Sequence, residues 1–267
     1  MKKIIYVLGI VLSVLSCSND ENSNDINQNS TRDNSDRLIS LDDYYEFIKV
    51  NSHDKILVQH TKFINSNDAI QSLSAIRNSS SNPYILKLNG SEFIPNYIYN
   101  SQSLSTYNLN DTQLSNIYGK KLKLDFFKDI NLTLDTSENY NIYIPNILEV
   151  SVSNLSPEGE IKVGTKITWN ADNLNTNGIT LLSEYSPSTQ SDASIANNYP
   201  NILVGGKTIL DNGSYVIQSE DLDGLPKGAR VKFTLGRAGF TITNNGDINK
   251  DISFGAYTMV KGEYIIN

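Results

Sequence analysis

The sequence predicts a mainly β protein, in which residues 146–267 form an antiparallel β-sandwich and residues 38–145 form a smaller β-rich region with short helices. Two observations carry this prediction. Short runs rich in Val, Ile, Thr, Tyr and Phe recur at the spacing typical of a sandwich. Residues that favour tight turns separate these runs, namely Pro157-Glu158-Gly159, Asn177-Gly178, Asp211-Asn212-Gly213, Pro226-Lys227-Gly228 and Asn245-Gly246-Asp247.

A helical pattern is confined to residues 38–80. Ser40 is placed to cap the segment LDDYYEFIK, and Asp43 completes a capping box. Apolar side chains of this segment fall on one side of a helix, namely Leu41, Tyr44, Phe47 and Ile48. Asn67 stands in the same capping position before DAIQSLSAIR. We therefore expect two short helices, ending where NSSSNP breaks the pattern.

From Tyr84 onward the pattern favours strands. YILKLNGSEFI predicts two strands joined at Asn89-Gly90, which is a strong signal for a two-residue hairpin. KLKLDFF at residues 121–127 alternates polar and apolar side chains, as a half-buried strand does. INLTL and YNIYI are further candidates, and we expect the boundary between the two regions near Pro145-Asn146.

The C-terminal region, residues 146–267, carries nine strand candidates: ILEVSVS, TKITWNA, GITLLSEY, NILVG, SYVIQ, RVKFTLGR, FTIT, ISFGAYTMV and EYII. Two stretches, GTKITWNADNLNTNGITLLSEY and DNGSYVIQSEDLDGLPKGARVKFTLGR, resemble the terminal Ig-like module of uncharacterised Bacteroidota-type surface lipoproteins. The resemblance implies an Ig-like antiparallel β-sandwich at the C-terminus and a cell-surface context. It implies no enzyme activity and no particular ligand.

Residues 1–17 have the three parts of a secretory signal. Lys2 and Lys3 are the positive end, an apolar run follows, and small residues lead to Cys17. The run is shorter than the roughly 20 residues that cross a bilayer. VLSC, ending at Cys17, resembles the lipobox of bacterial lipoproteins, which implies an acylated Cys17 as the first mature residue. The alternative is an ordinary cleaved signal peptide.

Residues 18–37 are almost entirely polar, which predicts a disordered acidic tether because they bury too little apolar surface to fold. Asp20 and Glu21 resemble the export signal of lipoproteins on the outer face of the outer membrane. We therefore expect a protein anchored by lipid in the outer membrane and facing the cell exterior. A periplasm-facing lipoprotein with a polar spacer is the alternative.

The charge of the chain limits its partners. It carries 22 Lys and Arg against 29 Asp and Glu, and Lys2 and Lys3 leave with the signal. This acidic balance argues against nucleic acid, and also against a polybasic membrane contact besides the lipid anchor. A surface protein or a glycan remains as a possible partner.

The sequence offers little for catalysis. Cys17 is the sole cysteine, which excludes an intramolecular disulfide, and no Gly-x-Ser-x-Gly motif is present. His53 and His60 lack the spacing of a metal pair, so we expect both to be ordinary polar positions. We expect no enzyme activity and no cofactor.

Two motifs resemble ligand loops without completing them. GGKT at residues 205–208 lacks the first glycine of a phosphate-binding loop, and we expect it to be a turn between strands. Asp247, Asn249 and Asp251 place oxygen ligands at alternate positions, as in a calcium loop, but the glycine and glutamate of an EF-hand are missing. A looser calcium site is the weaker interpretation, and a solvated hairpin turn is the favoured one.

The aromatic residues offer two further hypotheses. Trp169, the sole tryptophan, shares a strand face with Thr165 and Ile167, which favours a place in the core over a sugar-stacking platform. Five tyrosines are candidates for an exposed binding surface, namely Tyr97, Tyr99, Tyr118, Tyr140 and Tyr143.

Together these features predict a non-catalytic binding or structural module on the cell surface. The alternative is a glycan-capturing accessory lipoprotein of a polysaccharide-uptake system, and an enzyme of unknown type is the third choice. The ligand-binding residues are not identified by the sequence.

Overall fold

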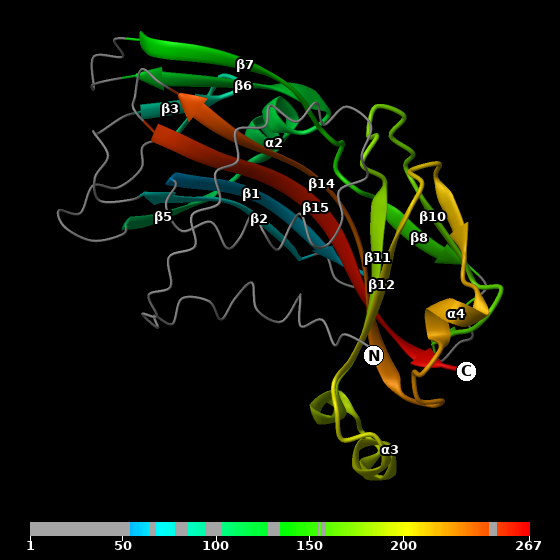
Figure 1. Ribbon diagram of the computed structural model, residues 1–267. Coiled ribbons are helices and arrows are strands. Elements are labelled where there is room, and N and C mark those ends of the chain that lie inside the picture. The colour runs from blue at the N-terminus through cyan, green and yellow to red at the C-terminus, as the bar shows by residue number, and fades with distance from the viewer. Residues whose placement is uncertain are drawn as a thin grey trace.

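The computed structural model describes residues 54–64, 68–77, 85–93, 103–127, 134–153, 155, 159–245 and 250–267 (Figure 1). Several predicted features lie outside these residues. They are the signal and tether with Cys17, Asp20 and Glu21, the first expected helix, His53, Tyr97, Tyr99, Asp247 and Asn249.

The protein is mainly β with largely antiparallel sheets, as predicted. The largest sheet has eight strands. Their spatial order is β12 (Leu203–Ile209), β11 (Ile179–Tyr185), β14 (Arg230–Asn245), β15 (Lys250–Ile266), β1 (Asp54–Phe63), β2 (Ala69–Arg77) and β5 (Ser103–Asn108), while β9 (Glu160–Ile161) pairs with the end of β15. β1 and β9 run parallel to β15, and the other neighbours are antiparallel.

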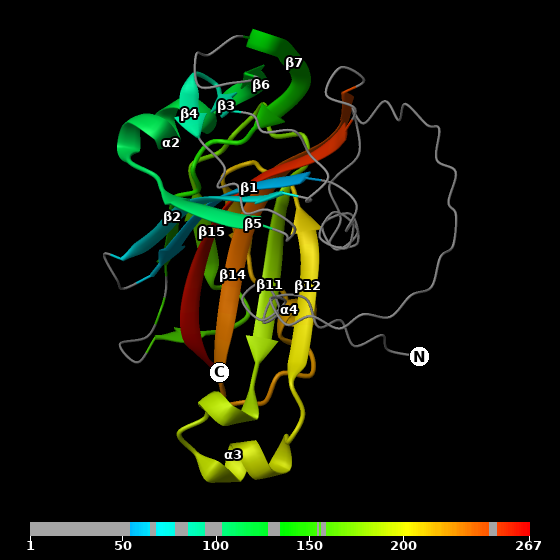
Figure 2. The ribbon, with the colours of Figure 1, turned by 90° about the vertical axis from the view of Figure 1, so that its left-hand side faces the viewer.

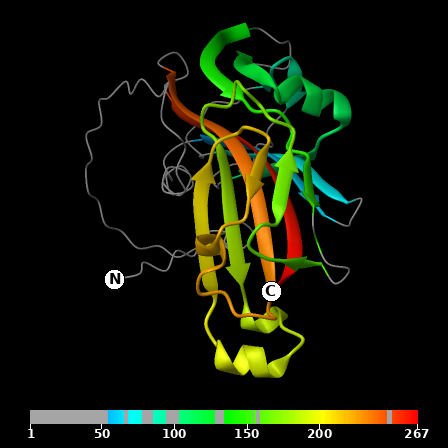
Figure 3. The same ribbon diagram turned by 90° about the vertical axis from the view of Figure 1, so that its right-hand side faces the viewer.

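Two smaller antiparallel sheets accompany it among the described residues. One has the order β4 (Ser91–Phe93), β3 (Ile85–Leu88), β6 (Lys120–Phe127) and β7 (Leu134–Ile144). The other has the order β13 (Ser214–Val216), β10 (Lys166–Trp169) and β8 (Val150–Ser153). Figure 3 shows this three-stranded sheet lying across β11 and β14.

Both small sheets cover the same face of the large one. Along β15, Phe254 and Ala256 belong to the core under the four-stranded sheet, whereas Val260, Tyr264 and Ile266 belong to the core under the three-stranded sheet. Alternate residues of a strand share a face, so one side of β15 serves both cores. The second core lies between the three-stranded sheet and the antiparallel strands β12, β11, β14 and β15 of the large sheet, which makes the C-terminal part a β-sandwich.

The large sheet takes strands from both sides of Pro145. β1 pairs with β15 from Asp54 opposite Ile252 to Phe63 opposite Lys261. Pro145 itself follows the last residue of β7 and leads toward β8. The chain therefore passes from the four-stranded sheet to the three-stranded sheet at the expected boundary. The large sheet, in contrast, contains strands from both sides of that boundary.

The hairpin predicted at Asn89-Gly90 is confirmed. Asn89 and Gly90 have φ angles of 46° and 85°, and they join β3 to β4. Positive φ at both central residues gives the backbone twist that suits a two-residue hairpin. The predicted strand at residues 121–127 is confirmed as part of β6.

The expected helix at DAIQSLSAIR is wrong, because Ala69–Arg77 form β2. Leu73 and Ala75 point into the core with exposures of 0% and 2%. The apolar spacing fitted a helix, but hydrogen bonding to β1 on one side and β5 on the other decides for a strand.

An unexpected short helix, α2 (Asp111–Ile117), follows β5. It begins with a capping box, in which the Asn110 side chain accepts from the Gln113 N–H at 2.9 Å and the Gln113 side chain accepts from the Asn110 N–H at 3.1 Å. Leu114 and Ile117 pack into the core under the four-stranded sheet.

β14 and β15 are longer than the strands predicted there. RVKFTLGR and FTIT form one strand, as do ISFGAYTMV and EYII. Gly239 does not end β14. A Cβ at Gly239 would lie 2.9 Å from the Tyr143 carbonyl oxygen, so glycine lets β7 pass close over the continuing strand.

GGKT is likewise not a turn, because residues 205–208 lie inside β12 and pair with β11. The connection between these two strands is elsewhere. It carries η2 (Pro187–Thr189) and α3 (Ala193–Asn198) and projects beyond the end of the large sheet (Figure 2). The Gln190 side chain ties it to β14 by two hydrogen bonds of 2.8 Å with the backbone of Arg230.

Candidate functional site

An open cavity of about 860 Å³ lies between the three-stranded sheet and the end of β1. We call it the β1–β8 groove. Its lining residues are Lys62, Phe63, Ile64, Glu149, Val150, Ser151, Thr168, Trp169, Asn170 and Val260. Its volume lies within the range of small-ligand pockets.

One wall of the groove is the edge of the three-stranded sheet. β8 is the outer strand of that sheet and pairs with β10 from Val150 opposite Trp169 to Ser153 opposite Lys166. Asn170, just after β10, fixes the entry to β8. Its N–H donates to the Glu149 carbonyl at 3.3 Å, its side-chain oxygen accepts from the Glu149 N–H at 2.8 Å, and its side-chain amide donates to the Ile147 carbonyl at 2.8 Å.

Trp169 is a core residue, as predicted. It is 7% exposed and belongs to the second core, with one side lining the groove. Its indole N–H donates to Oδ1 of Asp211 at 2.8 Å. The indole therefore presents little free ring surface to a ligand.

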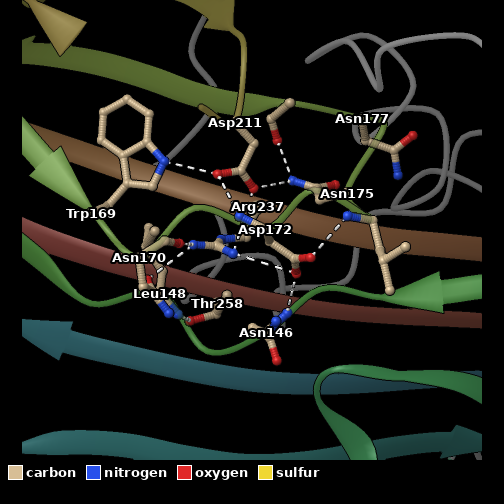
Figure 4. Close-up of polar contacts among 12 residues, drawn as sticks. Asn146, Leu148, Trp169, Asn170, Asp172, Asn175, Asn177, Asp211, Arg237 and Thr258 are labelled. Atoms are coloured by element: carbon tan, nitrogen blue, oxygen red, sulfur yellow. Dashed lines mark hydrogen bonds and ion pairs between the residues drawn. The ribbon is translucent and has the colours of Figure 1, made fainter. Parts of the chain in front are cut away.

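Asp211 belongs to a buried charge cluster with Asp172 and Arg237, shown in Figure 4. Nη1 of Arg237 lies 3.5 Å from Oδ2 of each carboxylate. Asp211 also accepts from the Asn175 amide at 2.8 Å, and Asp172 accepts from the backbone N–H of Asn146 at 2.8 Å. The cluster ties four chain segments together behind the groove.

Arg237 connects this cluster to the groove wall. Its Nη2 donates to the Asn170 backbone carbonyl at 2.5 Å and to the Asn170 side-chain oxygen at 3.1 Å. Burial lowers the pKa of Arg237, and the carboxylates of Asp211 and Asp172 oppose that effect. Because one guanidinium faces two carboxylates, its removal would leave two buried acids without a cation.

The other wall is the end of β1, where Lys62, Phe63 and Ile64 line the groove. Ile64 N–H donates to the Lys261 carbonyl at 2.7 Å, which continues the pairing of β1 with β15 beyond Phe63. Ile64 also packs against the second core. Lys62 and Glu149 are both exposed, so the two walls carry opposite charges at the groove.

His60 of β1 is connected through Thr258 of β15 to Leu148, which precedes the groove residue Glu149. Its Nδ1 lies 3.3 Å from Oγ1 of Thr258, which also accepts from the Leu148 N–H at 3.0 Å. His60 is 5% exposed and makes an edge contact with Tyr118, so it is a buried residue of the fold, and its lack of a catalytic or metal-binding role stays a prediction. Burial, and then Lys62, lower the pKa of His60.

A second polar cluster closes the far side of the sandwich. Lys207 of β12 contacts the Tyr215 hydroxyl of β13, and the same hydroxyl donates to Asp221 at 2.7 Å. Asp221 lies on α4 (Ser219–Leu222) and pairs with Lys207 at 2.5 Å. This contact joins the edges of two sheets, and the sequence analysis did not indicate it.

The tyrosine hypothesis is partly wrong. Tyr118 is 6% exposed, and its hydroxyl donates to the Tyr257 carbonyl at 2.7 Å, so it is a core residue. Tyr143 is half-buried. The side chain of Tyr140 lies outside the described part of the chain, as do Tyr97 and Tyr99.

Of the calcium candidates, Asp251 lies in β15 and the other two are not described. Within the described residues, no group of three or more His, Cys, Asp or Glu side chains is placed to hold a metal ion. Every helix in that same part of the chain is too short or too polar to cross a bilayer.

No protein-family model and no curated protein matches the chain. Among solved structures, one match is the crystal structure of the chicken CNTN1 FN1-FN3 domains, at 10% sequence identity and a TM-score of 0.18. The match covers 77% of this chain and 66% of that one. The assignment to the β-sandwich class therefore rests on the sheets and cores described above.

Proposed function

We propose that this protein is a lipid-anchored outer-membrane protein that acts as a non-catalytic binding or structural module on the cell surface. Three sequence features support the anchoring: the signal segment, the lipobox-like approach to Cys17 and the acidic tether at residues 18–37, which contains Asp20 and Glu21. The resemblance of residues 164–185 and 211–237 to Bacteroidota-type surface lipoproteins supports the same setting.

The β1–β8 groove is the observation that carries the binding role. Its walls are polar and carry Lys62, Glu149 and Asn170, and its small apolar floor lies at Val260 and Trp169, which are both largely buried. A concave site with apolar surface and a few polar groups is the usual form of a ligand site. Its charged lining residues, Lys62 and Glu149, lie on opposite walls, an arrangement that suits recognition of a zwitterionic or mixed-charge surface.

The second candidate function is glycan capture for a polysaccharide-uptake system. The hydroxyls of Ser151 and Thr168 on the groove favour it, because they can exchange hydrogen bonds with sugar hydroxyls. An enzyme of unknown type is the third choice.

The anchor is tested by replacing Cys17 with Ser and fractionating the cells. The wild type should take up labelled fatty acid and stay with the outer membrane, whereas the Cys17→Ser protein should carry no label and leave the membrane fraction. A variant that stays fully membrane-bound, beside a wild type without label, would refute the anchor.

The groove is tested with a glycan array and a set of surface proteins as probes of the full-length protein in detergent. Binding should fall in Lys62→Glu and in Glu149→Lys, and it should persist in the control Lys227→Glu, an exposed residue on another loop. Equal binding by all three variants would remove the groove from the proposal.

A further inference from the structure

Among the described residues β8 pairs only with β10, and the first residues of its outer edge lie at the β1–β8 groove, which Val150 and Ser151 line. Asn170 N–H donates to the Glu149 carbonyl directly opposite it, so residues 149, 151 and 153 direct their backbone groups toward β10. On the other side of β10, Trp169 N–H donates to the carbonyl of Gly213, the residue just before β13. The backbone groups of β10 therefore point alternately toward β8 and toward β13, which agrees with the register of β8. The backbone N–H and C=O groups of Val150 and Val152 therefore point away from β10.

These outward groups have no hydrogen-bond partner that we can identify in the described residues, and Val150 is itself a lining residue of the groove. An unpaired strand edge is a template for another extended chain. The outward backbone groups of Val150 therefore lie at the groove beside its apolar floor, and those of Val152 continue the same strand edge just beyond it.

We infer that the β1–β8 groove binds an extended segment of a partner polypeptide, which adds to β8 as a further strand of the three-stranded sheet. This inference rests on the proposed binding function and names its ligand class. β8 has four residues, so it offers an edge of about 13 Å at about 3.3 Å per residue. Main-chain hydrogen bonds to Val150 and Val152 would supply affinity, as in other strand-addition complexes.

Side chains of the bound segment would alternate between the groove floor and the solvent. Those facing inward would meet Val260 and Ile64, which favours small or branched apolar residues. Lys62 and Glu149 stand exposed on the two walls and would favour an acidic and a basic residue, respectively, nearby. The recognised segment is therefore apolar at alternate positions and charged with both signs.

The state of Trp169 favours a peptide over a sugar. Sugar stacking needs an open aromatic face, whereas Trp169 is 7% exposed and its N–H is already bonded to Asp211. Backbone recognition makes no such demand on the indole, because the free groups belong to the edge of β8.

The test begins with the full-length protein in detergent and a phage-displayed library of random linear peptides. A selected peptide is then resynthesised with a single N-methyl group at each backbone position in turn. N-methylation should weaken binding by about tenfold at every second position and have little effect between them, because only alternate N–H groups face β8. Equal effects at all positions, or no peptide binder, would overturn the inference.

Two proline variants locate the site. In Val152→Pro the missing N–H is an outward one, so pairing with β10 should survive while peptide binding falls about tenfold. Val216→Pro is the matched control, because Val216 directs its backbone outward on the opposite edge, β13, of the same sheet. The control should bind the peptide like the wild type. Loss of binding in the control, or retention in a folded Val152→Pro protein, contradicts the inference.

The N-methyl scan uses the wild-type protein, so it decides the question even where a proline variant does not fold. A glycan array run in parallel separates this inference from the proposed function. A glycan bound in the groove and lost in Lys62→Glu, with no peptide binder, overturns strand addition and leaves the binding function standing. If neither peptides nor glycans bind, both the strand-addition inference and the proposed binding function are refuted.

Discussion

The indole N–H of Trp169 donates to Oδ1 of Asp211 at 2.8 Å, across 42 residues of sequence. This bond joins the hydrophobic core of the sandwich to the buried cluster of Asp172, Asp211 and Arg237. Because Arg237 also donates to Asn170 at the groove wall, one connected set of contacts holds the floor and one wall of the groove. The shape of the groove therefore depends on the charge cluster behind it.

Replacing Arg237 with Met should destabilise the protein strongly. Asp172 and Asp211 would remain buried without their cation, and breaking a buried pair in this way typically costs about 3–5 kcal/mol. Arg230→Met is the control, because its ion pair with Glu263 is about half exposed and worth less than about 1 kcal/mol. Urea unfolding measures both. Equal midpoints for the two variants would contradict the assigned role of Arg237.

Tyr264→Phe should stabilise the protein by about 1 kcal/mol. The Tyr264 hydroxyl is buried with no hydrogen-bond partner identified in the described residues, so the native state bears its desolvation cost. The matched change Tyr185→Phe should destabilise by a similar amount, because the Tyr185 hydroxyl donates to the Tyr199 carbonyl at 2.9 Å. Thermal unfolding of the pair decides, and a loss of stability in Tyr264→Phe would mean that its hydroxyl has a partner.

The same tyrosine predicts a loss of stability in alkali. Burial raises the pKa of Tyr264 to about 12 from an ordinary value of 10.0. The unfolded chain therefore releases this proton first, and stability falls as the pH rises above 10.0 toward the folded-state value. Tyr264→Phe should show a smaller fall across that window in urea titrations. An unchanged slope would contradict the burial of the hydroxyl.

Gly239→Ala should destabilise by about 1–3 kcal/mol, because the new Cβ would lie 2.9 Å from the Tyr143 carbonyl oxygen. Gly236→Ala in the same strand is the control. Its Cβ would meet Met259 and Thr258 at 3.6 Å, which is ordinary contact. Chemical unfolding of both variants compares them, and similar stabilities would mean that β7 does not pass as close to β14 as described.

Acid should weaken the fold through His60. Burial and Lys62 lower the pKa of His60 below its ordinary 6.5. The unfolded chain then binds the proton first, so stability falls as the pH drops through 6.5 and levels off below the folded-state pKa. A His60→Gln variant should lack this part of the pH dependence in unfolding titrations. Identical curves for variant and wild type would remove His60 as the cause.

The sequence predicted most strands of the protein, because its turn residues are local signals. Asn89-Gly90 specifies its hairpin from two residues alone. Strand ends were harder to predict: Gly239 looks like a break, yet it serves the close approach of β7, which comes from far away in the chain. The apolar residues of DAIQSLSAIR fit the spacing of a helix as well as that of a strand. Only its pairing with the neighbouring strands β1 and β5 makes it a strand.

The candidate site was hardly predictable. Trp169 was expected in the core on the strength of its strand face, and that was confirmed. Its partner Asp211 looked like a turn residue, and nothing near it in the sequence indicated Asp172 or Arg237. The groove itself forms where β1 ends beside β8, so it depends on how distant strands meet rather than on a motif.

The most direct test of the surface-binding account is protease shaving of intact cells that carry the full-length protein. The account predicts that the part of the chain that carries the sheets, from Asp54 onward, is cut from intact cells, while a periplasmic marker protein stays whole. If the folded part is protected in intact cells and digested only after lysis, it faces the periplasm and the account of a surface-displayed binding module is contradicted.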